Sequence, residues 1–195
     1  MPVAIDCKNA RTAVLVMDYQ NGILASYPEP ERARLLNDAQ PLLGAARQAG
    51  LPVIYIRVAF RPGYPEVSDR NKLFSGIRSA GALQEGTDSA ELCEAVAPKT
   101  GDVVITKRRV GAFSTTDLKA VLDARDIDQL ILFGVSTSGV VLSTVRWAAD
   151  ADYKMIVVPD LCLDRDEEVH RVLVERVFPR QAEVVSRDAV LDALR

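Results

Sequence analysis

The sequence has very little histidine and cysteine. Its 195 residues include one histidine, His170, and three cysteines, Cys7, Cys93 and Cys162. This excludes a metal centre built mainly from histidine and any Ser–His–Asp triad that does not include His170. The cysteines are few, odd in number and not spaced like metal ligands, which favours a reducing compartment. We therefore expect a cytoplasmic protein whose thiols are small, buried or partly buried side chains.

The sequence also lacks a large excess of either charge and a long apolar run. It has 24 Lys and Arg against 27 Asp and Glu, so its net charge is −3, and its pI is near 5.3. These values argue against a nucleic-acid surface and a polybasic membrane face. No apolar run is long enough to span a bilayer, and the segment MPVAIDCKNARTAVLV lacks the order of a signal peptide. We expect neither nucleic acid nor a membrane as a partner.

Glycine-rich phosphate-binding motifs are missing as well. The first apolar run is followed by DYQNG rather than GxGxxG, and GxxxxGK[ST] does not occur. We therefore expect no cofactor.

What is present is an alternation of apolar runs typical of strands with segments of helical spacing, in a chain that is 48% hydrophobic. The predicted strands cover residues 12–17, 52–59, 102–106, 129–135, 154–158 and 182–185. The predicted helices cover residues 31–48, 115–124, 140–150, 165–178 and 188–194. This alternation predicts an α/β fold of three layers, α/β/α and Rossmann-like, with helices on both faces of a six-stranded, mostly parallel sheet. We expect a single domain over residues 1–195.

A long polar segment, residues 60–90, follows the second predicted strand. It carries several basic residues, among them Arg61, Arg70 and Arg78, and Arg57 precedes it. Loops of this length in compact domains are usually functional or disordered. The segment is either a solvated excursion or a pocket wall that brings arginines to an anionic substrate, and the sequence leaves both interpretations open.

Three predicted strands end in residues that suit a binding site. The first ends at Asp18, the third at Lys107, and the fourth runs into a turn of small residues, 135–139. Ligands of open α/β sheets bind beyond the carboxyl ends of the strands. An aspartate at the end of a buried strand is costly unless it has a partner, and Lys107 is the candidate. The pair is either a structural ion pair or part of an active site, and the turn is either a plain connection or a ligand-binding wall.

Three segments together carry a resemblance that covers nearly the whole chain. They are AVLVMDYQNGI (13–23), TKRRVGAFSTTDL (106–118) and GVSTSGVVLSTVRWAADADY (134–153), and VVPDLCLD (157–164) is a weaker match. In this order they resemble the isochorismatase-like hydrolase superfamily, also called the cysteine hydrolase family. The resemblance implies a homo-oligomer, a dimer or tetramer, that acts on a small molecule.

The resemblance also implies a catalytic triad of aspartate, lysine and cysteine. The aspartate corresponds to Asp18 and the lysine to Lys107, but the cysteine of the pattern Gly-Val-x-Thr-x-x-Cys-Val corresponds to Val140. Amidase members form a thioester at that cysteine, which valine cannot do. The other cysteines lie elsewhere in the pattern, and none is expected to substitute. We expect substrate contacts from Gln20, Arg57, Phe113, Val135, Ser136, Gly139 and Val140.

Metal-binding members use an aspartate and histidines after the second strand, where this chain has no histidine. We therefore predict no metal. Trp147 could belong to the core or to an interface, and we expect it in the core.

One branch of the superfamily, the isochorismatases proper, lacks the cysteine. These enzymes hydrolyse a vinyl ether and release pyruvate, with a general acid that protonates the enol-ether carbon. Asp18 fits that role if burial raises its pKa, whereas Lys107 acts in the opposite direction. Arg57, Arg61 or Arg108 would then bind the two carboxylates of an isochorismate-like substrate. Two alternatives stay open: a binding or regulatory protein that has lost the reaction, and a hydrolase of other bonds in which Asp18 activates water.

Overall fold

The computed structural model describes residues 11–195, so Cys7 lies outside the described residues. Six strands form one sheet in the order β3-β2-β1-β4-β5-β6, and every neighbouring pair is parallel. The strands are β1 (Thr12–Met17), β2 (Val53–Val58), β3 (Val103–Lys107), β4 (Gln129–Gly134), β5 (Lys154–Val157) and β6 (Glu183–Val184). The predicted six-stranded α/β fold is confirmed, and the sheet is parallel throughout.

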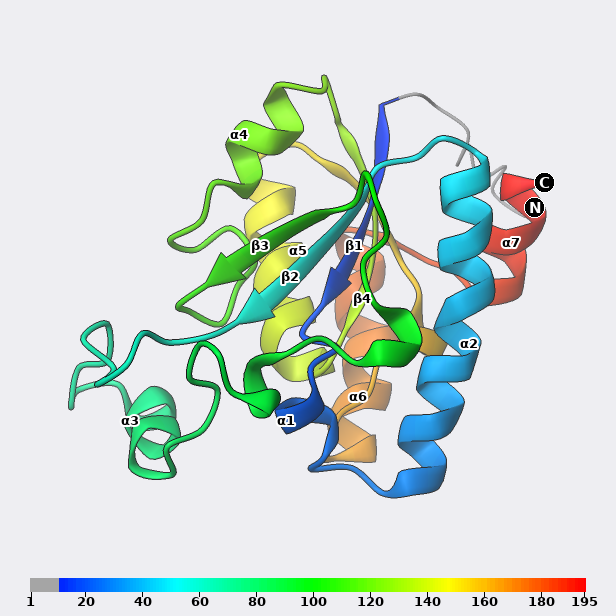
Figure 1. Ribbon diagram of the computed structural model, residues 1–195. Coiled ribbons are helices and arrows are strands. Elements are labelled where there is room, and N and C mark those ends of the chain that lie inside the picture. The colour runs from blue at the N-terminus through cyan, green and yellow to red at the C-terminus, as the bar shows by residue number, and fades with distance from the viewer. Residues whose placement is uncertain (1–10) are drawn as a thin grey trace.

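Helices cover both faces of the sheet (Figure 1). One face carries α2 (Glu29–Gln48) and α7 (Arg187–Leu194), which pack against each other. The opposite face carries α4 (Leu118–Asp123), α5 (Leu142–Asp150) and α6 (Glu167–Val172). The short helix α1 (Asn21–Leu24) follows β1 directly. Within the described residues, no helix has both the length and the apolar character needed to cross a membrane.

The centre of the sheet is buried on both sides because β1 and β4 are apolar along their whole length. All six residues of each strand are buried. Gly134 at the end of β4 is required by this packing, since a Cβ there would lie 2.7 Å from both the Cβ and the carbonyl oxygen of Met17. The strand order reverses between β1 and β4, because β2 and β3 extend the sheet on one side of β1 and β4, β5 and β6 extend it on the other. This reversal places a crevice at the carboxyl ends of β1 and β4.

Several predicted helices differ from the observed ones at their ends. The predicted helix begins at residue 31, whereas α2 begins at Glu29. Pro30 fits in the first turn, because the N–H that proline lacks would have no helical partner there. The helix predicted over 165–178 is divided into α6, a π-helical turn (Leu173–Val177) and a 3-10 turn (Phe178–Arg180).

The segment between β2 and β3 differs most from the prediction. Residues 60–90 contain α3 (Lys72–Ser79), whose first turn is capped by the Asn71 side chain accepting from Phe74 N. A second hydrophobic cluster holds this segment together, and it consists of Val58, Phe60, Tyr64, Val67, Phe74 and Leu83. We call residues 60–90 the α3 lobe. Figure 1 shows α3 standing away from the sheet, beyond the carboxyl end of β2.

Candidate active site

Asp18 and Lys107 meet at the carboxyl end of the sheet. Asp18 follows β1 with a left-handed backbone, φ +59°, and its N–H donates to the carbonyl of Ile56 in β2 at 2.8 Å. Lys107 is the last residue of β3, and its Nζ donates to Asp18 Oδ2 at 2.8 Å across the end of β2. The side chains are 6% and 2% exposed. The structure therefore brings the predicted pair together as a buried ion pair.

The two oxygens of the Asp18 carboxyl have different surroundings. Oδ2 accepts from Lys107, whereas Oδ1 is buried and has no hydrogen-bond partner among the described residues. Burial raises the pKa of Asp18, and the opposing effect of Lys107 is smaller. Lys107 Nζ also donates to the carbonyl of Arg109 at 3.2 Å, so one of its three N–H donors remains. Burial thus makes Asp18 easier to protonate than a free aspartate, and Oδ1 has no partner among the described residues.

The turn after β4 forms the third side of the site. The peptide bond between Val135 and Ser136 is cis, and a π-helical turn, Thr137–Val141, leads into α5. The N–H of Thr137 donates to Leu163 O at 2.8 Å, and that of Ser138 donates to Asp164 Oδ2 at 2.7 Å. Both acceptors lie after β5, so the loop between β5 and α6 holds this turn in place.

A cavity of about 480 Å³ joins these groups. Six predicted site residues line it: Asp18, Lys107, Val135, Ser136, Gly139 and Val140. A Cβ at Gly139 would lie 2.7 Å from Ser136 Oγ, so a side chain there would require the Ser136 hydroxyl to move. The volume suits a small molecule.

Comparison with known proteins agrees with this architecture. The isochorismatase domain model matches residues 12–189. The chain belongs to the isochorismatase family. It is 29% identical to maleamate amidohydrolase of Pseudomonas putida, over 95% of this chain and 87% of that protein. It is 33% identical to the phenazine biosynthesis protein PhzD of Pseudomonas fluorescens, over 93% of this chain and 85% of that protein.

The fold of this isochorismatase-family chain is similar to the crystal structure of a cysteine hydrolase from Pseudomonas syringae pv. phaseolicola. The TM-score is 0.84 at 28% identity, and the match covers 95% of this chain and 92% of that chain. Family membership makes the chain an isochorismatase-family hydrolase. Among its predicted triad positions, Val140 lies in the cavity with Asp18 and Lys107 and carries no group that can attack a substrate.

Three predicted substrate-binding residues of this family member do not line the cavity. Gln20 is fully buried and joins two other segments: its amide donates to Val58 O and Ala90 O, both at 2.8 Å, and accepts from Val58 N. Arg57 donates to Thr106 Oγ1 at 3.1 Å and pairs with Glu91 at 3.4 Å.

Phe113 instead stacks on Trp147, with ring centroids 3.9 Å apart and an interplanar angle of 14°. Trp147 is 37% exposed, so the expectation that it lies in the core was wrong. It projects from α5 far enough to cover Phe113 and remain in contact with solvent.

The arginines expected to bind substrate carboxylates are paired with acidic side chains instead. Arg61 pairs with Glu66 at 2.5 Å. Arg108 pairs with Glu66 at 3.3 Å and also with Glu85, and it donates to Ala59 O. The Arg108 contacts hold the α3 lobe against the end of the sheet, whereas the Arg61–Glu66 pair lies within the lobe.

Sequence reasoning missed the residues that the α3 lobe contributes to the cavity. Leu73, Phe74 and Ile77 of α3 line it, as do Asp164 and Arg165 after β5. The available signal was Asn71, a good helix cap, followed by apolar residues at helical spacing. Arg165 had no such signal, because its position depends on the course of the loop between β5 and α6.

The two described cysteines are poor nucleophiles. Cys93 and Cys162 are both buried, and burial raises the pKa of each thiol, that of Cys162 to about 12. Cys162 Sγ donates to Val158 O at 3.4 Å. Both therefore remain protonated near neutral pH, as expected of structural thiols.

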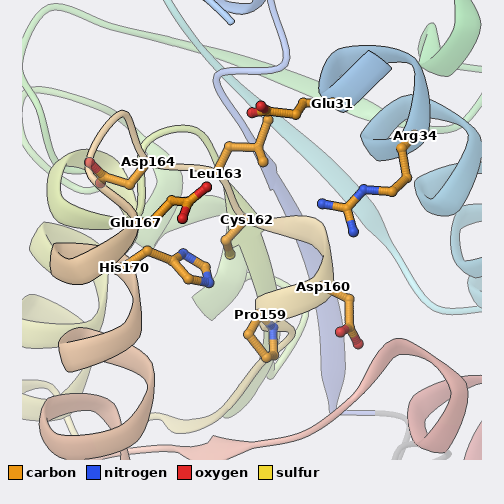
Figure 2. Close-up of a pocket in the computed structure, with 9 residues that line it drawn as sticks. All are labelled: Glu31, Arg34, Pro159, Asp160, Cys162, Leu163, Asp164, Glu167 and His170. Atoms are coloured by element: carbon orange, nitrogen blue, oxygen red, sulfur yellow. The ribbon is translucent and has the colours of Figure 1, made fainter. Parts of the chain in front are cut away.

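A second cavity, of about 360 Å³, lies on the other side of the loop between β5 and α6. Figure 2 shows His170 and Glu167 of α6, Glu31 and Arg34 of α2, and Cys162 around it. His170 Nδ1 and Thr137 Oγ1 are 2.8 Å apart, so the histidine contacts the turn after β4 through a hydrogen bond. Burial lowers the pKa of His170. Asp164 lines both cavities.

Among residues 11–195, no three His, Cys, Asp or Glu side chains are arranged to hold a metal ion.

Proposed function

We propose that this chain hydrolyses a small anionic vinyl ether without a cysteine nucleophile, with Asp18 as the general acid. The observation that supports this is the Asp18 carboxyl itself. It is buried, one oxygen has no partner among the described residues, and burial raises its pKa. It lines the cavity that also contains Val140, where the resemblance expects a nucleophile.

The chemistry requires a proton and a water molecule but no covalent intermediate with the protein. Asp18 donates its proton to the terminal carbon of a 1-carboxyvinyl ether, which produces an oxocarbenium ion. Water adds to the cationic carbon and returns a proton to the Asp18 carboxylate. The hemiketal then breaks its C–O bond, releasing pyruvate and an alcohol or phenol. Lys107 stabilises the Asp18 carboxylate between the two proton transfers.

The experiment measures pyruvate release from two carboxyvinyl ethers, isochorismate and 2-phenoxyacrylate. We expect the wild-type protein to release pyruvate from at least one, and Asp18→Asn to lower the rate by about 100-fold or more, since general acids contribute roughly 100- to 10,000-fold. Asp150→Asn, at the exposed end of α5, is the matched control and should retain the rate. Circular dichroism of each variant verifies folding. Turnover that is unchanged in Asp18→Asn contradicts the proposal, as does release of acid or amine from ester and amide panels without pyruvate.

A second candidate function is a small-molecule-binding protein that has lost the reaction, and Val140 is the observation that favours it. Maleamate amidohydrolase is by its name an amide hydrolase, but valine cannot form the thioester that a cysteine would form there. The cavity would then bind without turnover.

The test restores the missing thiol with Val140→Cys. We expect this variant to hydrolyse p-nitrophenyl acetate at least about ten-fold faster than wild type, because it places a thiol in the cavity that holds Lys107. Val141→Cys is the control, since Val141 is buried and does not line the cavity. Gain of esterase activity in Val140→Cys alone, with no pyruvate release by wild type, supports the binding protein. Equal activity of the two variants contradicts it.

A further inference from the structure

We propose that the substrate of this cavity is a monoanion with an apolar body, whose single carboxylate is bound by the Lys107 and Arg165 charges and whose ring or alkyl group packs on the α3 lobe. The reaction assigned to that substrate and the charge of its cavity rest on the proposed function, because both require a protonated Asp18, whereas the apolar wall and the paired arginines do not.

The first argument is the apolar wall. Leu73, Phe74, Ile77 and Leu83 of the α3 lobe line the cavity, and Val110 and Val140 continue the same wall. Leu73 is 58% exposed although it belongs to this wall. An exposed leucine beside a cavity leaves apolar surface in water, which an apolar ligand would cover. A ligand that carried charge on this side would leave that charge without a polar partner.

The second argument is the state of the arginines around the site. Arg57 is paired with Glu91, Arg61 with Glu66, and Arg108 with Glu66 and Glu85. None of the three arginines lines the cavity. A second substrate carboxylate would therefore have to break an existing ion pair or remain unpaired.

The third argument is the charge of the lining. The ionisable groups that line the cavity are those of Asp18, Tyr27, Lys107, Asp164 and Arg165. Asp164 is a carboxylate fixed by the N–H of Ser138. When Asp18 carries the proton that a general acid needs, the cations Lys107 and Arg165 face one anion, Asp164. The lining then has one net positive charge. One carboxylate neutralises it, and two exceed it.

The experiment compares two unreactive ligands that differ by one carboxylate. These are 2-phenoxypropanoate, a monoanion, and 3-(1-carboxyethoxy)benzoate, a dianion, and neither has the double bond that the reaction needs. Isothermal titration calorimetry of the wild-type protein should give about ten-fold tighter binding of the monoanion, because an unpaired carboxylate on an apolar wall is costly. Equal or tighter binding of the dianion overturns the inference, as does the absence of millimolar binding of both.

Two variants test the two halves of the site. Leu73→Gln should weaken 2-phenoxypropanoate binding by about three-fold or more, because it replaces apolar contact area, and leave the binding of lactate, which lacks the ring, unchanged. Val169→Gln is the control, since Val169 is also partly exposed but lies on α6 outside the cavity. Equal effects of the two substitutions overturn the apolar assignment.

Arg165→Gln should weaken both 2-phenoxypropanoate and lactate by about five-fold, the loss expected when a charge-assisted contact is removed. Arg176→Gln is its control, because Arg176 is exposed and does not line the cavity. Unchanged binding in Arg165→Gln overturns the assignment of the carboxylate.

These outcomes can be distinguished from those that test the proposed reaction. Preferred binding of the monoanion without pyruvate release from 2-phenoxyacrylate contradicts the proposed reaction and supports the inference. Pyruvate release accompanied by preferred binding of the dianion supports the proposed reaction and contradicts the inference.

Discussion

Asp18 has a left-handed backbone conformation and a buried carboxyl group. One oxygen of that carboxyl has no hydrogen-bond partner among residues 11–195. Aspartate tolerates φ > 0 better than most residues, which makes the sharp exit from β1 possible. The backbone turns the carboxyl toward Lys107, and the ion pair offsets part of the cost of burial. The pair is therefore a structural contact, and in the proposed function it is also where the proton transfer takes place.

The stability of the pair is the first prediction at this scale. At a pH above the pKa of Asp18, where the pair is ionised, Asp18→Asn should lower the free energy of unfolding by about 3–5 kcal/mol, because it leaves the Lys107 ammonium buried and unpaired. Adding Lys107→Met should restore most of that loss, since the unpaired charge is removed. Urea denaturation of the wild type, the single variant and the double variant measures this. A double variant no more stable than Asp18→Asn would show that the lysine is not the source of the loss.

The pH dependence of turnover is the second prediction. The general acid must be protonated, so kcat/KM for a carboxyvinyl ether should fall as pH rises through the pKa of Asp18. Burial raises that pKa above the ordinary value of 3.8, so the fall should lie at higher pH than for a free aspartate. Initial rates of pyruvate release across the pH range give the midpoint. A rate that instead rises with pH over that range would mean that Asp18 acts as a base.

At the scale of elements, the contact between β1 and β4 positions the site. Gly134 of β4 faces Met17, the residue before Asp18, with no space for a side chain. Both strands end at the cavity, so any separation of them displaces Asp18 relative to the turn after β4.

Gly134→Ala tests this packing. The added Cβ would lie 2.7 Å from the Met17 carbonyl oxygen, so we expect a loss of about 1–3 kcal/mol, as for overpacked cores. Gly76→Ala in α3 is the matched control, since a Cβ there meets nothing within 4 Å and alanine is about 1 kcal/mol better than glycine in helices. Thermal unfolding of both variants distinguishes the two effects, and equal shifts would contradict the packing argument.

At the scale of the whole molecule, the sheet was predictable because each strand is a short apolar run between polar turns. The meeting of Asp18 and Lys107 followed from the rule that carboxyl ends of parallel strands share one edge. The strand order did not follow, and neither did the reach of Lys107 across the end of β2, because pairing depends on contacts between distant segments. The arginine partners and the cavity wall were missed for the same reason: Arg108 and Glu85 are far apart in sequence.

The α3 lobe has a hydrophobic cluster of its own, and it is inserted between two neighbouring strands. Its side chains therefore pack largely apart from those that cover the faces of the sheet. Substitutions in this insert can change which molecules are accepted while Asp18 and Lys107 keep their places. The lobe's wall of the cavity and the strands that carry Asp18 and Lys107 thus belong to separate hydrophobic clusters, so one can be redesigned for a new ligand without repacking the other.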